Sequence, residues 1–189
     1  MKRLIFLLTI ILLVSACSEQ YSESSDSEFF ENPPLIVAAE AGDLPTIRKL
    51  IEGQSPVDVQ DACMWTPLMK AALNGHLQAT QSLLDAGAKV NQVDKGGYSA
   101  LMLAVSNNHH QIAELLLSRG AHVNQIETTG GWSALIWAAK LGHTDSVETL
   151  LDHNANTELV DFDDLSALDW AKKNQHNKIV RLLETAQTQ

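Results

Sequence analysis

The sequence predicts an all-α solenoid of about five helix-turn-helix repeats with β-hairpin loops between them. A helix-opening motif recurs with its leucines spaced by 33, 33, 34 and 33 residues. These leucines are Leu35, Leu68, Leu101, Leu135 and Leu168, and each is followed in the same frame by an alanine three residues later. A second set of leucines keeps that frame as well: Leu50, Leu83, Leu116, Leu150 and Leu183. A fixed period of this length is typical of repeat arrays, in which each unit needs its neighbours to bury its apolar face.

Residues 1–16 have the pattern of a signal peptide. A basic start, Lys2-Arg3, precedes an apolar run over residues 4–14 that is too short for a comfortable transmembrane helix. Residues 13–17, LVSAC, resemble the bacterial lipobox, and this resemblance implies cleavage before Cys17 and lipid on that residue. An ordinary secretory signal with a chance cysteine, or an uncleaved anchor, is the alternative. Several acyl chains would give stable membrane attachment.

Residues 17–32 are expected to form the lipidated cysteine and an acidic, disordered tether. The segment after Cys17 is rich in serine and contains five acidic residues and no basic ones. In Gram-negative lipoproteins an aspartate directly after the cysteine retains the protein in the inner membrane, whereas Ser18 stands here. We therefore expect a lipid-anchored protein of the bacterial cell envelope, at the outer membrane and facing the periplasm.

The stretch 65–91 shows how one repeat is built. Thr66 is a suitable N-cap and Pro67 suits the first helical turn. Leu68, Ala71 and Ala72 then share one helical face. Asn-Gly at 74–75 ends this helix, a second helix follows, and Gly-Ala at 87–88 ends the second one. Neither helix is long enough to be stable alone.

The whole repeat pattern resembles the ankyrin repeat. The matching features are TPL at 66–68, Gly-His at 75–76 and 142–143, the leucine pairs, Gly-Ala at 87–88 and 120–121, and Val-Asn at 90–91 and 123–124. The resemblance covers residues 33–189, with repeats at about 33–61, 62–94, 95–128, 129–161 and 162–189. It implies helix pairs linked by hairpin loops, here called fingers, and a concave face that binds partners.

Two departures from the family pattern bear on the structure. The histidine that normally follows TPL is replaced in every repeat, by Ile36, Met69, Met102, Ile136 and Asp169. Apolar packing is therefore expected to replace part of the usual hydrogen bonding. Met64 and Asp164 stand where two fingers should carry glycine, and a left-handed backbone there would cost about 1–2 kcal/mol for each residue.

The composition argues against several function classes. The formal net charge is −10, and removal of the leader makes the chain more acidic still, so neither nucleic acid nor an anionic membrane surface is expected as the main partner. His76, His109, His143 and His176 share one repeat position, but repeats stack about 10 Å apart, too far to share a zinc ion. We expect these histidines to bond within their own turns. The carboxylates are unpaired in the sequence and no catalytic triad is recognisable, so we expect no enzyme, no metal and no cofactor.

The resemblance places the partner-binding surface on the fingertips and on the inner face of the first helices. Exposed aromatic residues of the kind that dominate interface energies occur at these positions. The predicted tip column is Trp65, Tyr98, Trp132 and Leu165, and the predicted groove residues are Lys70, Leu73, Asn107, Trp137, Lys140 and Trp170. The alternative is that the aromatic residues pack along neighbouring fingers and bind nothing.

Together these features predict a non-catalytic, lipid-anchored protein-protein interaction module. The expected partner is a protein, the expected membrane contact is the lipid on Cys17, and a monomer is expected, with no small-molecule substrate. An immunity or regulatory factor for one envelope or periplasmic enzyme is the first alternative. A metal or redox accessory protein, acting through the histidines or Cys63, is the second.

Overall fold

The computed structural model describes residues 32–188, which belong to the compact unit Asn32–Gln189. The predicted signal peptide, Cys17 and most of the predicted tether lie outside the described residues. Within the described part of the chain, ten helices follow one another as five pairs. The first helices of the pairs are α2 (Pro34–Ala41), α4 (Pro67–Leu73), α6 (Ala100–Ser106), α8 (Ala134–Leu141) and α10 (Ala167–Lys173). The second helices are α3 (Leu44–Glu52), α5 (Leu77–Asp85), α7 (His110–Ser118), α9 (Thr144–Asp152) and α11 (Asn177–Ala186).

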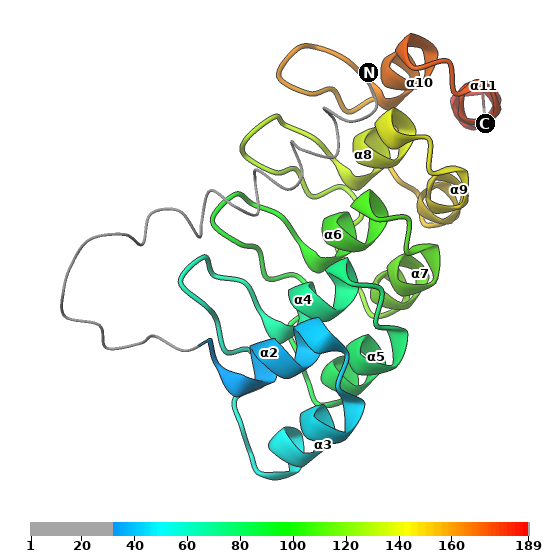
Figure 1. Cartoon of the computed structure of the whole chain (residues 1–189). Helices are drawn as coiled ribbons and strands as arrows, with labels where there is room; N and C mark the ends of the chain where they lie inside the picture. Colours follow the sequence, from blue (N-terminus) through cyan, green and yellow to red (C-terminus); the bar gives the residue numbers. More distant parts are fainter. Residues whose placement is uncertain (1–31, 189) are drawn as a thin grey trace, which may run out of the picture. The chain divides into compact units, whose positions relative to one another are not determined.

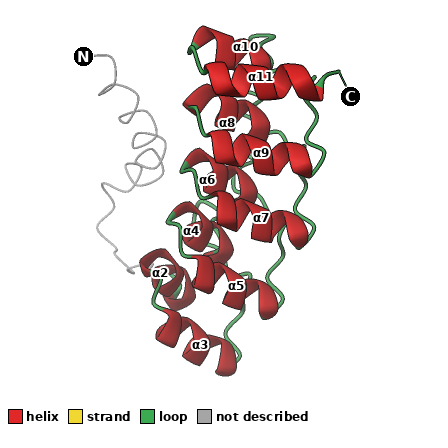
Figure 2. Cartoon of the chain, turned by 90° about the vertical axis from the view of Figure 1, so that its right-hand side faces the viewer, coloured by secondary structure: helices red, strands yellow, loops and turns green. Residues whose placement is uncertain are grey.

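The pairs stack so that the helices form two rows. Each first helix contacts the first helix of the next repeat, and Figure 1 shows this row lying between the second helices and the projecting loops. Figure 2, viewed from the side of the second helices, shows both rows rising in the same order through the stack. The predicted all-α repeat solenoid is confirmed.

Side-chain caps explain where four of the first helices begin. Thr66, Ser99, Ser133 and Ser166 each accept a hydrogen bond from the backbone N–H three residues later, at 3.2–3.3 Å. An N-cap of this kind is worth about 1 kcal/mol. The α2 helix has proline at its N-cap position and no side-chain cap. The capped positions are the ones that the repeat spacing predicts.

The fingers contain very little strand pairing. No strand occurs within residues 32–188, and three fingers are each closed by one antiparallel bridge: Val93–Ser99, Ile126–Ser133 and Val160–Ser166. Met64 and Asp164 adopt left-handed backbone angles, with φ of 65° and 58°. Both replace the expected glycine without changing the turn, so both fingers carry the strain that the sequence predicts.

The core lies between the two rows and runs the length of the stack. The recurrent alanines of the first helices are fully buried, as are Leu83, Leu116, Leu150 and Leu183 of the second helices. A buried leucine contributes about 1.5–3 kcal/mol through the hydrophobic effect. Ile36, Met69, Met102 and Ile136 are also buried, as expected for apolar residues that replace the family's histidine.

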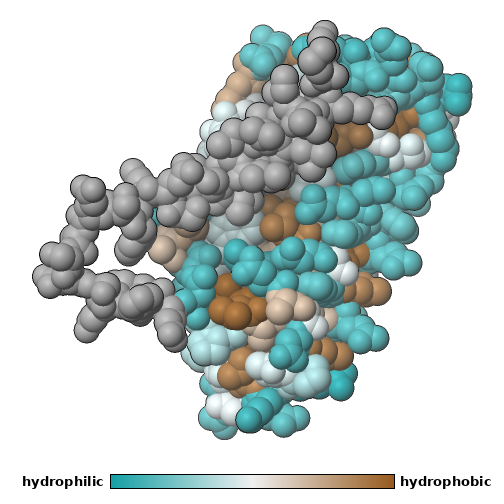
Figure 3. All heavy atoms as spheres, viewed as in Figure 1, coloured by the Kyte–Doolittle hydropathy of each residue, from teal (hydrophilic) through white to brown (hydrophobic). Residues whose placement is uncertain are grey.

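The two ends of the stack differ in polarity. Figure 3 shows mainly polar residues over the last repeat and apolar atoms exposed among the first repeats. At the last repeat, Lys172 pairs with Glu184 at 3.3 Å, and Lys178 pairs with Glu148 at 3.0 Å. At the other end, Val37 of α2 is half exposed. A polar outer face is what a terminal repeat needs to remain soluble. None of the helices in residues 32–188 is long and apolar enough to cross a membrane.

Candidate functional site

The turn of each finger is organised by the acidic residue that precedes it. Asp94 Oδ1 accepts hydrogen bonds from the backbone N–H groups of Gly96 and Tyr98, both at 2.9 Å. Asp61 makes the same two bonds, to residues 63 and 65, at 2.8 and 2.9 Å. Asp161 makes them to residues 163 and 165, at 3.0 and 2.9 Å. In each case the second donor is the predicted tip residue, so the carboxylate fixes the position of the tip column.

The finger with one extra residue uses a longer acid. Glu127 Oε1 accepts from the N–H groups of Gly130 at 2.7 Å and Trp132 at 3.0 Å, and Oε2 accepts from the N–H of Thr129 at 2.5 Å. The Thr129 hydroxyl donates to Oε2 as well. Burial alone would raise the pKa of Glu127, but these hydrogen bonds hold its pKa below the ordinary value. The additional methylene of glutamate thus spans the five residues to Trp132, where aspartate spans four.

Two of the tip residues form hydrogen bonds to the following finger. Trp65, Tyr98, Trp132 and Leu165 are all half-buried. The Tyr98 hydroxyl lies 2.9 Å from the Thr129 hydroxyl, and Trp132 Nε1 donates to Asp161 Oδ2 at 3.0 Å. Tyr98 and Trp132 are therefore each bonded to the next finger through one polar atom and remain partly exposed.

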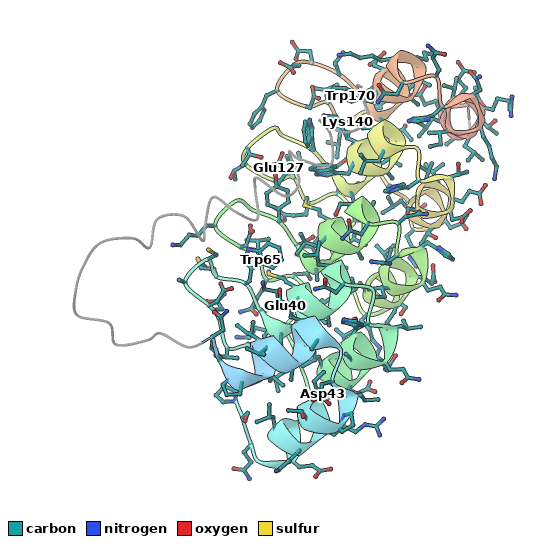
Figure 4. All side chains as sticks on the ribbon, in the orientation of Figure 1. Glu40, Asp43, Trp65, Glu127, Lys140 and Trp170 are labelled. Atoms are coloured by element: carbon teal, nitrogen blue, oxygen red, sulfur yellow. The ribbon has the colours of Figure 1, made fainter. Side chains whose placement is uncertain are left out.

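Five residues at the fourth and fifth repeats form what we call the Trp–Lys cluster: Trp132, Trp137, Lys140, Trp170 and Lys173. The Lys140 Nζ lies 3.5 Å from the ring centroid of Trp132 and 3.9 Å from that of Trp170. The Lys173 Nζ lies 4.4 Å from the Trp170 ring centroid. Trp132 packs edge-to-face against Trp137 at 4.6 Å and against Trp170 at 6.4 Å. Figure 4 shows Lys140 and Trp170 together at the junction of these repeats.

Asp161 is hydrogen-bonded to two of the indoles in the cluster. This buried carboxylate accepts from Trp132 Nε1 at 3.0 Å and from Trp170 Nε1 at 2.7 Å, in addition to its two backbone bonds. Burial acts to raise the pKa of Asp161, and the hydrogen bonds outweigh it and keep the pKa below the ordinary value. Because one aspartate fixes two indoles from different repeats, the aromatic faces presented to Lys140 have a defined geometry.

Burial changes the acid-base behaviour of Lys140. Only 8% of this residue is exposed. Desolvation lowers its pKa to about 8, with Lys173 acting in the same direction and the carboxylates of Asp161 and Asp163 opposing it. The ammonium is therefore still the main form at neutral pH, and its charge is balanced mainly by ring faces and nearby carboxylates.

The groove residues of the earlier repeats, Lys70, Leu73 and Asn107, all have partners within the fold. Lys70 pairs with Glu40 at 3.2 Å, and its Nζ lies 4.8 Å from the Trp65 ring centroid. Asn107 Nδ2 donates to the Leu73 carbonyl at 2.8 Å, which ties the second repeat to the third. Leu73 itself packs against the core. These residues thus have structural partners that their sequence positions do not reveal.

One exposed aromatic residue lies on a fingertip, as its sequence position predicts, but belongs to neither the predicted tip column nor the predicted groove residues. Phe162, at the tip of the last finger, is 70% exposed, more than any other large apolar residue in the described part of the chain. Its ring lies over Gly131, where an added Cβ would stand 2.6 Å from Cδ1 of Phe162. The signal in the sequence is an aromatic residue directly after the finger's acid, where the other fingers carry Ala62, Lys95 and Thr128.

The recurrent histidines bond between repeats, which corrects the expectation that each bonds within its own turn. Four imidazoles donate to carbonyls of the preceding repeat: His76 to Glu40 at 3.0 Å, His109 to Leu73 at 3.2 Å, His143 to Val105 at 2.9 Å and His176 to Lys140 at 3.3 Å. Glycine makes room for three of these rings, because a Cβ at Gly42, Gly75 or Gly142 would lie 2.5–2.7 Å from the nearest ring atom. We call this set the histidine ladder. No cluster of three metal-ligating side chains occurs among the described residues.

Comparison with known families agrees with this geometry. The family model for ankyrin repeats (3 copies) matches residues 35–127 and 122–188, and the model for the prokaryotic membrane lipoprotein lipid attachment site matches residues 1–18. No curated protein matches the chain. The two ankyrin matches together span most of the chain and coincide with the five helix pairs. The chain belongs to the ankyrin repeat family, and it begins with a lipoprotein lipid attachment site.

Proposed function

We propose that this protein is anchored to the envelope by lipid on Cys17 and holds a protein partner against its fingers and first helices. The family is one of protein-interaction modules and is typically non-catalytic, and the attachment site indicates lipid anchoring. The finer parts of the proposal are the surface that binds, an outer-membrane location facing the periplasm, and a monomeric state.

The observation that supports the proposal is the exposure of aromatic side chains on the fingers. Phe162 is largely exposed, and Trp65, Tyr98 and Trp132 are half exposed on successive fingers. The carboxylate turns hold these aromatic residues in place without a partner, so little conformational entropy is lost when a partner binds. Exposed aromatic residues on a preorganised scaffold are typical anchors of protein interfaces.

Affinity capture with the repeat domain, residues 33–189, tests the proposal in solubilised envelopes of the source cell. Phe162→Ala removes the most exposed anchor, while Leu77→Ala removes an exposed apolar side chain from the row of second helices. We expect one protein to be captured by the wild type and by Leu77→Ala, and at least about tenfold less of it by Phe162→Ala. Equal capture by all three proteins would refute a finger-mediated interaction.

A further inference from the structure

The Trp–Lys cluster contains one buried hydrogen-bond donor that the protein does not pair, and beside it an ammonium group that forms no ion pair. Trp137 is 7% exposed, and its Nε1 has no hydrogen-bond acceptor within residues 32–188. Lys140, three residues later on α8, takes part in none of the ion pairs of this part of the chain. Residues three apart lie on the same side of a helix. Buried polar groups are nearly always hydrogen-bonded, so an unpaired indole N–H beside an ammonium group without an ion pair points to an acceptor supplied by a partner.

The nearby carboxylate is not that acceptor. Asp161 Oδ1 already accepts two backbone N–H groups, and Oδ2 accepts the indole N–H groups of Trp132 and Trp170. A carboxylate has about four acceptor positions, and these four bonds occupy them. Asp161 therefore orients the aromatic rings around Lys140 but leaves the ammonium without a hydrogen-bond acceptor.

The charge of the site selects the ligand. The ammonium groups of Lys140 and Lys173 already lie over the rings of Trp132 and Trp170, so a further cation would be repelled by two positive charges. Two ammonium groups and one indole N–H form a set of donors only. Lys173 is exposed at the edge of the cluster, where it can attract an anion toward Lys140.

We propose that Lys140 and Trp137 bind the side-chain carboxylate of an aspartate or glutamate in a partner protein, with Lys173 guiding its approach. This inference rests on the proposed function and names the chemistry of the partner at one place on the surface. The partner segment therefore presents its acidic residue at the fourth and fifth repeats, where Lys140 of α8 and Lys173 of α10 lie.

Two peptides that differ in one group provide the test: acetyl-Leu-Ala-Glu-Ala-Leu-amide and its glutamine counterpart, titrated at equal ionic strength and pH 7. The indole N–H resonances of the ¹⁵N-labelled domain report binding, and Trp137→Phe assigns the resonance of interest. We expect the glutamate peptide to shift the Trp137 resonance saturably, with an affinity at least about tenfold above that of the glutamine peptide. Equal shifts with both peptides, or no saturable shift with either at millimolar concentration, would overturn the proposal.

Variants at Lys140 and a pH series sharpen the test. Lys140→Met keeps the alkyl chain and removes the charge, so it should abolish the preference for glutamate, while Lys140→Arg should retain part of it. The groups facing Lys140 are Asp161, Asp163 and Lys173. Since its pKa is about 8, affinity for the glutamate peptide should fall as pH rises through 8, well below the range in which an exposed lysine titrates. A pH-independent affinity between pH 7 and 9 would contradict the assignment of Lys140.

Failure of this site and failure of the proposed function give different results. If the envelope partner is captured equally well by wild type and by Lys140→Met, the carboxylate site is wrong and partner binding stands. If no partner is captured but the peptides bind with the expected preference, the carboxylate site stands and the proposed function fails.

Discussion

The contact between Gly75 and His109 provides a sharp test of how neighbouring repeats are joined. Gly75 has a φ of 77°, and a Cβ at this position would lie 2.6 Å from Cε1 of the His109 ring. Gly87 has a φ of 89°, and a Cβ there would meet nothing within 4 Å. Gly75→Ala and Gly87→Ala therefore introduce the same kind of backbone strain, but only the first forces a neighbouring ring to move.

The expected free-energy costs differ accordingly. Left-handed strain costs about 1–2 kcal/mol for alanine in either variant. In Gly75→Ala the displaced imidazole also loses its 3.2 Å hydrogen bond to the Leu73 carbonyl, which is worth about 1 kcal/mol. Repacking of the ring adds about 1–2 kcal/mol. We expect Gly75→Ala to lower the free energy of unfolding by about 2–3 kcal/mol more than Gly87→Ala does.

Urea unfolding followed by far-UV circular dichroism and by tryptophan fluorescence measures this difference, provided that the two probes give coincident transitions. A double-mutant cycle isolates the contact. In Gly75→Ala with His109→Ala the ring is absent, so the double variant should be more stable than the sum of the single effects by about 1–3 kcal/mol. Equal costs for Gly75→Ala and Gly87→Ala, or strict additivity in the cycle, would refute the steric account of this junction.

Three further predictions concern pH, backbone strain and anchoring. Burial lowers the pKa of His109 and of His143, and their hydrogen bonds to carbonyls oppose it only in part. The histidines of the unfolded chain have pKa values near 6.5, so near and below that pH the unfolded chain binds more protons than the folded chain does. The melting temperature should therefore decrease as the pH is lowered from 7.5 to 5.5. A melting temperature that does not change over this range would contradict the prediction. Met64→Gly should relieve left-handed backbone strain of about 1–2 kcal/mol. The greater freedom of glycine in the unfolded state offsets about 0.4–1 kcal/mol of this gain, and the urea midpoint should rise. Met64→Ala keeps the strain and should show no gain, and a midpoint raised equally by both variants would argue against the strain account. Cys17→Ser should move the full-length protein from the membrane to the soluble fraction of the envelope. The control variant Cys63→Ser should leave it on the membrane. Continued membrane association of Cys17→Ser would exclude lipid on that residue as the anchor.

The helix pairs could be predicted from the sequence because they follow from local signals. Thr66-Pro67 opens α4 at the predicted residue, and the glycine at 75 closes the turn after it. The recurrent acids before the fingers are visible in the sequence as well. Each of the three aspartates accepts two backbone N–H groups in the same way, so one of these fingers explains the other two.

What the sequence could not supply is the contact between repeats. Whether a histidine bonds within its own turn or reaches the preceding repeat depends on the stacking distance, which no single repeat encodes. The burial of Trp137 and Lys140 has the same origin, because the corresponding residues of the first repeat, Val37 and Glu40, are both exposed. The exposure of Phe162 depends on neighbours in the same way, because this residue lies on the last of the four fingers within residues 32–188.

The finger with the extra residue shows how a length change can be absorbed locally. Counting the period locates the insertion within residues 128–131, but only the structure shows that Glu127 compensates for it by reaching one residue further than aspartate does. The change from aspartate to glutamate therefore compensates for the change in spacing within the same finger.

The hydrogen bonds of the histidine ladder all run in one direction, from each repeat to the repeat before it. Each imidazole completes the helix end of the repeat before it, and the four histidines serve four junctions, with no histidine after His176. A copied block that carries its own histidine and its own glycine brings both halves of a new junction with it. Duplication or loss of whole repeats would then lengthen or shorten the surface offered to a partner while each remaining junction is preserved, so proteins of this design can change their reach without redesigning their core.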